Sequence, residues 1–173
     1  AITQAGGYRP RPKLISLSGR ALRIGYVSAD ICQHTVGLLI KDVLKRHDPE
    51  RVSAFVYGAG RFEDWVTKEI KGVTQFREVS AVNDLELADW IREDRIDVLI
   101  DLSGHTAGSR LMAFAHRPAP VMVSWLGYFA TTGLPYIDAV LMDEWHAPVG
   151  AEAQFVEPIL RLPGGKFCYQ PVQ

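Results

Sequence analysis

The chain alternates short apolar runs with segments of helical periodicity, and this alternation constrains the fold more than any other feature. The apolar run Leu22–Ser28 is followed by residues 36–47, in which apolar side chains recur at spacings of three and four. Strands that alternate with helices form a parallel sheet with helices on both faces. The sequence therefore predicts a three-layer, Rossmann-like α/β domain with a mainly parallel sheet.

The same reading along the whole chain gives a set of predicted elements. Strands are predicted over residues 22–28, 52–58, 74–80, 96–102, 121–127, 138–144 and 158–163, and helices over 36–47, 61–72, 83–95 and 109–117. Asn83 is the predicted N-cap of the third helix, with Glu86 in the capping-box position, and Gly72 is predicted to end the second helix. Residues 1–20, which carry four basic side chains and no acidic one, are predicted to be a linker or docking tail, and residues 21–173 one domain.

Composition narrows the class of protein. A chain of 173 residues with 47% apolar and 23% charged residues suits a single globular domain. The net charge of −1 does not favour nucleic acid or an anionic membrane as a partner, and no apolar run has the roughly 18 residues that span a bilayer. The N-terminus lacks the apolar core of a signal peptide, and two isolated cysteines, Cys32 and Cys168, fit a reducing compartment. We therefore expect a cytoplasmic protein.

Polar loops follow three of the predicted strands. His34 lies in the loop after the first strand, and the loop "SGHTAG", with His105, follows the fourth strand, whose last residues are Asp101 and Leu102. The loop "GYFATTGLP", residues 127–135, follows the fifth. In open parallel sheets, ligands bind beyond the carboxyl ends of the strands. We therefore expect the three loops to open on one edge of the sheet and the two histidines to share one cleft.

Each of these loop residues has a functional and a structural interpretation. His34 is suited to act as a general base or to donate to a developing negative charge, but it is equally suited to cap the helix that follows. His105 is flanked by Gly104 and Gly108, and small residues allow close approach of a ligand. Asp101 would orient the imidazole or pair with a ligand hydroxyl; alternatively, it caps the strand end and leaves His105 as a solvated loop residue.

Other chemistries are less favoured by the spacing. His34, Asp101 and His105 could form a two-histidine, one-carboxylate metal set, but no HxxxH or HxH spacing supports it and no metal is predicted. Cys32 fits a small buried residue better than a thiol nucleophile. Neither a P-loop nor a GxGxxG fingerprint is present, which disfavours nucleotide hydrolysis and dinucleotide-dependent oxidoreduction. Structural roles are expected for the remaining histidines, His47, His116 and His146.

Three stretches of the sequence carry a family resemblance. "LRIGYVSADICQHTVG", "RPAPVMVSWLGYFATTGLPYID" and "EPILRLPGG" resemble the amino-terminal half of the catalytic region of the SPINDLY and O-GlcNAc transferase family. The resemblance extends from about Leu22 to Tyr169, and the "DLSGHT" variant is more similar to SPINDLY-type and bacterial members than to the animal enzymes.

The resemblance implies one lobe of a two-lobe GT-B glycosyltransferase. Such an inverting enzyme transfers GlcNAc or fucose from a nucleotide sugar to Ser or Thr hydroxyls of proteins, and its carboxyl-terminal lobe supplies most of the nucleotide contacts. The expected partners are therefore that lobe, an acceptor protein or peptide and a nucleotide sugar, which is a substrate; no cofactor or metal is expected. The resemblance places catalysis at His34 and His105. The substrate-binding residues that it implies are Asp101, Thr106, Tyr128, Thr131, Thr132 and Gly133.

The sequence stops where the second lobe would begin, so we expect the chain alone to be inactive. Two other functions stay open. A nucleotide-sugar epimerase shares the GT-B arrangement but needs acidic groups at the sugar, for which Asp101 is the only candidate. A non-catalytic protein-binding module is the other alternative.

Overall fold

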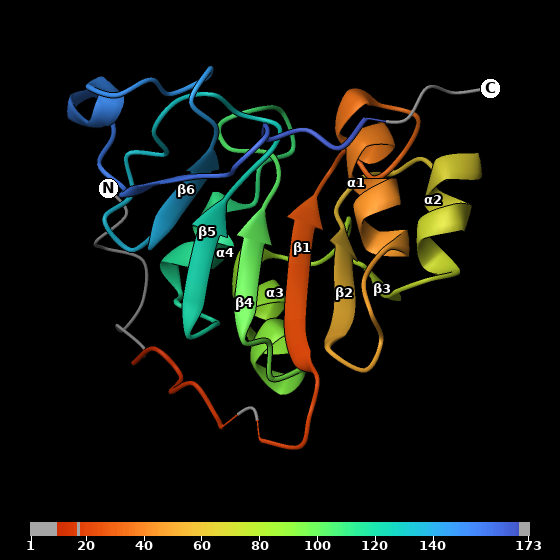
Figure 1. The fold of residues 1–173 in the computed structure, drawn as a ribbon. Coiled ribbons are helices and arrows are strands. Elements are labelled where there is room, and N and C mark those ends of the chain that lie inside the picture. The colour runs from red at the N-terminus through yellow and green to blue at the C-terminus, as the bar shows by residue number, and fades with distance from the viewer. Residues whose placement is uncertain (1–9, 17, 170–173) are drawn as a thin grey trace.

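The computed structural model, which describes residues 10–16 and 18–169, contains one parallel β-sheet. Within these residues the sheet has seven strands in the order β3-β2-β1-β4-β5-β6-β7, and each neighbouring pair is parallel (Figure 1). The strands are β1 (Leu22–Ser28), β2 (Val52–Gly58), β3 (Gln75–Glu78), β4 (Val98–Asp101), β5 (Val121–Ser124), β6 (Ala139–Met142) and β7 (Ile159–Arg161).

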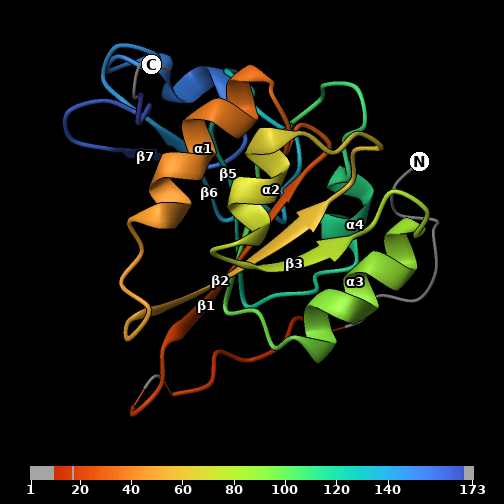
Figure 2. The ribbon, with the colours of Figure 1, turned by 90° about the vertical axis from the view of Figure 1, so that its right-hand side faces the viewer.

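Helices cover both faces of the sheet, which confirms the predicted three layers (Figure 2). The helices are α1 (Thr35–Lys45), α2 (Trp65–Lys71), α3 (Asp84–Glu93) and α4 (Leu111–Ala115), followed by a short 3-10 helix, η2 (Ala151–Gln154). Apolar side chains of α1 and α2, such as Ile40 and Ile70, pack in one core cluster. Those of α3 and α4, such as Ile91 and Phe114, pack in a second cluster on the other face. Burial on both faces explains why the central strands are almost wholly apolar.

The predicted elements are all present, but most are shorter than predicted. β4 covers four residues where seven were predicted, and α4 covers five where nine were predicted. Around β4, apolar residues extend beyond the residues that pair with the neighbouring strands, so the sequence alone does not mark where strand pairing begins and ends. Asn83 caps α3 in a capping box with Glu86, as predicted. Gly72 ends α2 as predicted, although its φ of −69° is right-handed, so the site does not require glycine's conformational freedom.

The order of the strands places the three polar loops at one edge of the sheet. β1 pairs with β2 on one side and with β4 on the other, so successive connections run in opposite directions from β1. Val27 is in register with Asp101, and Asp101 with Ser124, so β1, β4 and β5 end side by side. Ligands bind in open α/β sheets at such a reversal, beyond the carboxyl ends of the strands. The prediction that the three loops leave the same edge is therefore confirmed by the topology.

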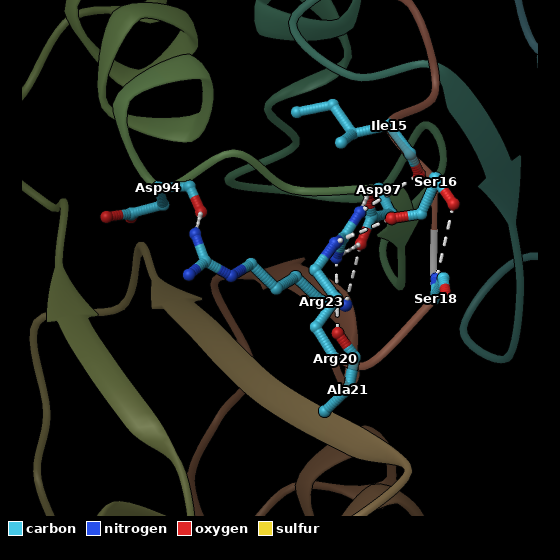
Figure 3. Close-up of polar contacts among 8 residues, drawn as sticks. All are labelled: Ile15, Ser16, Ser18, Arg20, Ala21, Arg23, Asp94 and Asp97. Atoms are coloured by element: carbon cyan, nitrogen blue, oxygen red, sulfur yellow. Dashed lines mark hydrogen bonds and ion pairs between the residues drawn. The ribbon is translucent and has the colours of Figure 1, made fainter.

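The segment before β1 follows the opposite edge, at the amino ends of the strands (Figure 1). Arg20 donates two hydrogen bonds, of 2.6 and 2.8 Å, to the carboxylate of Asp97, and the backbone N–H of Arg23 donates a third at 2.9 Å (Figure 3). Arg11 pairs with Asp138 at 2.6 Å. Of the predicted linker or docking tail, residues 1–9 and 17 lie outside the described residues; Arg11 and Arg20 bind the domain directly.

Candidate functional site at the carboxyl edge of the sheet

His34 is the N-cap of α1. Its Nδ1 accepts a hydrogen bond of 3.3 Å from the backbone N–H of Val36, and its backbone has the extended conformation of a cap. The structure thus realises the capping interpretation, while a catalytic role stays a prediction. The side chain is half exposed, at 50%, and Asp30 lies 4.0 Å from Nδ1. Because Nδ1 accepts a hydrogen bond, the ring proton lies on Nε2, which is the nitrogen left to face a ligand.

Asp101 holds the backbone of the loop after β4 by hydrogen bonds. Its side chain is almost fully buried and accepts hydrogen bonds from the backbone N–H groups of Ser103 (3.1 Å) and Gly104 (2.8 Å) and from Ser124 Oγ (3.0 Å). Burial raises the pKa of the carboxyl, and the donated hydrogen bonds oppose that rise. The carboxylate therefore supports the turn that carries His105; a contact with substrate stays a prediction.

His105 connects the loop after β4 to the loop after β5. Its Nε2 lies 2.7 Å from the carbonyl oxygen of Thr132, and its ring meets the ring of Tyr128 edge-on at 5.5 Å. A carbonyl oxygen only accepts, so Nε2 carries the proton and Nδ1 keeps its lone pair in the neutral imidazole. The preceding residue, Gly104, has a φ of +56°, and a Cβ there would lie 2.3 Å from Tyr128 Cβ. A residue other than glycine does not fit at this position.

The loop after β5 is held by a residue that sequence reasoning did not single out. Glu157, just before β7, is buried and accepts hydrogen bonds from Thr131 Oγ1 (2.6 Å), the backbone N–H of Thr132 (2.7 Å) and Thr132 Oγ1. The hydroxyl of Thr106, in the neighbouring loop, donates to the carbonyl oxygen of Ser103 at 2.8 Å. The predicted substrate-binding threonines therefore all donate to partners within the protein in this structure.

A second group of polar side chains follows β6 and β7. The buried Asp143 accepts hydrogen bonds from His146 Nδ1 (2.7 Å) and from the backbone N–H of Lys166 (2.8 Å), and these donors hold its pKa below the usual range although burial raises it. Burial lowers the pKa of Lys166 to about 8, and its Nζ lies 4.4 Å from the centroid of the Phe129 ring. His146 stacks on Phe129 at 5.5 Å and lines a hollow of about 360 Å³ with Phe129 and Phe155.

The sequence does contain a signal for Asp143, because this residue directly follows the buried strand β6, much as Asp101 is the last residue of β4. Glu157 and Lys166 lie in irregular stretches, where no periodicity indicates that a charged side chain is buried. Of the remaining histidines, His47 lies 2.8 Å from the hydroxyl of the buried Tyr26, and His116 is the C-cap of α4.

The structure brings some of the predicted site residues together and leaves His34 apart from them. His105, Tyr128 and Thr132 are linked by the contacts above, and Glu157, which was not predicted, joins this set through Thr132. Among the described residues, His34 makes no hydrogen bond or ring contact with this set, although its loop leaves the neighbouring strand end. Among the same residues, no group of three His, Cys, Asp or Glu side chains is arranged to hold a metal ion, and no helix is long and apolar enough to cross a membrane.

The fold and the site together define a class: a doubly wound α/β lobe with polar loops gathered at the point where the strand order reverses. Comparison with known proteins identifies the family within this class. It belongs to glycosyl transferase family 41, whose model matches residues 4–169. Among curated relatives, it is 39% identical over 160 residues to the UDP-N-acetylglucosamine–peptide N-acetylglucosaminyltransferase SPINDLY of Solanum lycopersicum, and 36% identical over 152 residues to the corresponding transferase SEC of Arabidopsis thaliana.

Solved structures agree with this assignment. A mutant of the O-GlcNAc transferase of Thermobaculum terrenum matches with a TM-score of 0.83 and 36% identity, over 86% of this chain and 29% of that one. The galactosyltransferase WaaB, at 14% identity and a TM-score of 0.52, shares the fold alone. The match to the SPINDLY relative covers 88% of this chain but only 17% of that protein. The match to SEC covers 87% of this chain and 15% of that protein. It therefore corresponds to one part of these proteins.

Proposed function

We propose that this chain is the amino-terminal catalytic lobe of an inverting protein O-glycosyltransferase that transfers GlcNAc or fucose from a nucleotide sugar to Ser or Thr of a protein. The observation that carries the proposal is the family match over residues 4–169, since the SPINDLY and SEC relatives are named as peptide N-acetylglucosaminyltransferases. The proposed setting is the cytoplasm. The proposed partners are a carboxyl-terminal lobe, the nucleotide sugar and the acceptor polypeptide, without a metal ion.

The hydrogen bonds at the two histidines support a division of roles. His34 offers Nε2–H, a donor suited to the negative charge of a sugar oxygen or departing phosphate. His105 offers the lone pair of Nδ1, which suits it to accept the proton of an acceptor hydroxyl. In this proposal Asp101 acts as a positioning residue, because its carboxylate holds the turn before His105.

Transfer assays on variants of the polypeptide that carries this chain test the roles of the histidines. His34→Ala and His105→Ala should each lower turnover by roughly 10²–10⁴-fold if the residue serves in proton transfer or charge stabilisation. His34→Asn is the matched control for folding, because asparagine also caps helices but lacks the imidazole. His34→Asn should keep the melting temperature and lose the activity. A fully active His34→Asn enzyme would leave His34 as a helix cap only.

Calorimetry of the 173-residue chain with UDP-GlcNAc or GDP-fucose tests the division between lobes. We expect affinity no better than millimolar, because most nucleotide contacts are assigned to the other lobe. Micromolar affinity would show that this lobe holds the nucleotide by itself. Interconversion of sugar epimers, without transfer to a protein, would favour an epimerase instead.

A further inference from the structure

The loop after β5 depends on side chains for its shape. Residues 128–134 lie outside helix and strand, so no regular ladder holds their backbone. The N–H of Gly133 donates to Thr131 Oγ1 at 3.0 Å, and that of Leu134 donates to Thr132 Oγ1 at 3.3 Å. The hydroxyls of the two threonines thus replace backbone carbonyls as acceptors within the loop.

Glu157 sets the orientation of both threonine hydroxyls, because its carboxylate accepts a hydrogen bond from each of them. The residue is 4% exposed. Each carboxylate oxygen accepts a hydrogen bond from a threonine hydroxyl, Oε2 from Thr131 and Oε1 from Thr132. Among the described residues no Lys, Arg or His forms an ion pair with Glu157, so neutral donors alone satisfy the carboxylate. Burial raises the pKa of Glu157, but the hydrogen bonds from Thr131 and Thr132 outweigh it and hold the pKa below the usual range. The carboxylate is therefore ionised at neutral pH.

Neither hydroxyl has a proton left to donate to a ligand, because both donate to Glu157. A threonine hydroxyl has one proton to donate, and in Thr131 and Thr132 that proton points to Glu157. Thr131 Oγ1 also accepts from the N–H groups of Gly133 and Val156, at 3.0 and 3.1 Å. Among the described residues, the N–H groups of residues 129, 130 and 131 donate to no hydrogen bond. With the N–H of Tyr128, these backbone groups are the donors that the loop has left for a ligand.

We propose that Glu157 is a positioning residue of the glycosyl-transfer site, which orients both threonine hydroxyls inward so that the loop meets the sugar nucleotide through the backbone N–H groups of residues 129–131. This inference rests on the proposed function and deepens it, because it replaces direct contacts from the hydroxyls of Thr131 and Thr132 with contacts from the backbone. His105 depends on the same arrangement, since its Nε2 is anchored on the carbonyl oxygen of Thr132.

A double-mutant cycle in the polypeptide that carries this chain tests the proposal. Thr131→Val removes the hydroxyl at nearly constant shape, and Glu157→Gln removes the charge at nearly constant size. Each change should lower kcat/KM for the nucleotide sugar by roughly 10-fold, the equivalent of one hydrogen bond to a charged group. The double variant should lose no more than the worse single variant, because both changes break the same contact. Glu144→Gln, at an exposed carboxylate, is the matched control and should leave kcat/KM unchanged.

Multiplicative losses in the double variant, or a Thr131→Val defect without a Glu157→Gln defect, would show that the hydroxyl contacts the substrate directly and would overturn the proposal. A second measurement requires no activity. In the 173-residue chain, the amide proton of Thr132 should exchange with solvent roughly 10-fold faster in Glu157→Gln than in wild type; an unchanged rate also overturns the proposal. A wild-type polypeptide that transfers no sugar overturns the proposed function as well, whereas an active wild type with a fully active Glu157→Gln variant overturns only the role of Glu157.

Discussion

Replacing Asp101 with alanine should destabilise the domain strongly, although the residue was singled out for a possible contact with substrate. The change removes the acceptor for the buried N–H groups of Ser103 and Gly104 and for Ser124 Oγ. A buried donor without a partner costs about 1–3 kcal/mol, so the two backbone groups alone predict a loss of about 2–6 kcal/mol. Typical domains have only about 5–15 kcal/mol of stability in total.

Urea denaturation of the 173-residue chain, monitored by circular dichroism, measures this loss. The unfolding midpoint should shift to lower urea concentration, while the dependence of the unfolding free energy on urea concentration stays constant. Glu144→Ala is the matched control, because that carboxylate is exposed and should change stability by less than about 0.5 kcal/mol. Asp101→Asn should lose less than Asp101→Ala, since the amide oxygen still accepts one of the donated bonds. If Asp101→Ala costs less than about 1 kcal/mol, the backbone donors have another partner and the reasoning from orphaned donors is wrong.

The pH dependence of the same experiment gives an independent check on Asp101. Burial raises the pKa of this carboxyl in the folded state, so its contribution to stability is complete below the unfolded pKa and is lost as pH rises through the folded one. The stability of wild type relative to Asp101→Asn should therefore fall over the interval above about pH 4, which is the ordinary pKa of an aspartate in the unfolded chain. A difference that rises over this interval would mean that the donated hydrogen bonds outweigh burial.

Three further changes test other parts of the structure. Gly104→Ala should lower the melting temperature by at least about 4 °C, because φ is +56° and the new Cβ would lie 2.3 Å from Tyr128 Cβ; a calorimetric scan measures it. Lys166→Met should abolish a rise in wild-type stability between about pH 8 and the usual lysine pKa of 10.5, since the folded state with its lowered pKa binds fewer protons there; denaturation at several pH values measures it. Arg20→Ala should destabilise the chain at neutral pH. That difference should shrink as pH falls below about 3.8, because hydrogen bonds from Arg20 and Arg23, against the effect of burial, hold the pKa of Asp97 below that value; acid titration of both proteins measures it.

The fold could be predicted from the sequence because its signals are local and periodic. Apolar runs gave each strand, helical spacing gave each helix, and the capping box at Asn83 and Glu86 marked the start of α3. The ends of the strands could not be predicted as well, since the ladder stops where the partner strand turns away. In β5 it stops at Ser124, while apolar and aromatic residues continue through Leu126.

The candidate site could be predicted only as a set of loops. The position of His34 and His105 after neighbouring strands follows from the alternation of strands and helices. The hydrogen bond from the Val36 N–H to His34 is local, and capping of this helix was one of the two interpretations that the sequence offered for His34. The contact of His105 with Thr132 could not be predicted, because the two residues are 27 positions apart in the chain. Glu157 could not have been found from spacing, since it acts on a loop 25 residues before it in the chain.

The buried carboxylate of Glu157 has a consequence for the electric field at this edge of the sheet. The carboxylate is ionised, and among the described residues no cation pairs with it. It lies behind the loop that faces the proposed sugar site. In a site of low dielectric constant, such a fixed negative charge repels a diphosphate and attracts positive charge. In the proposed reaction, it favours the positive character that develops at the sugar carbon as the bond to phosphate lengthens. In this proposal the negative charge of the departing diphosphate is stabilised by His34 Nε2–H and by groups of the carboxyl-terminal lobe.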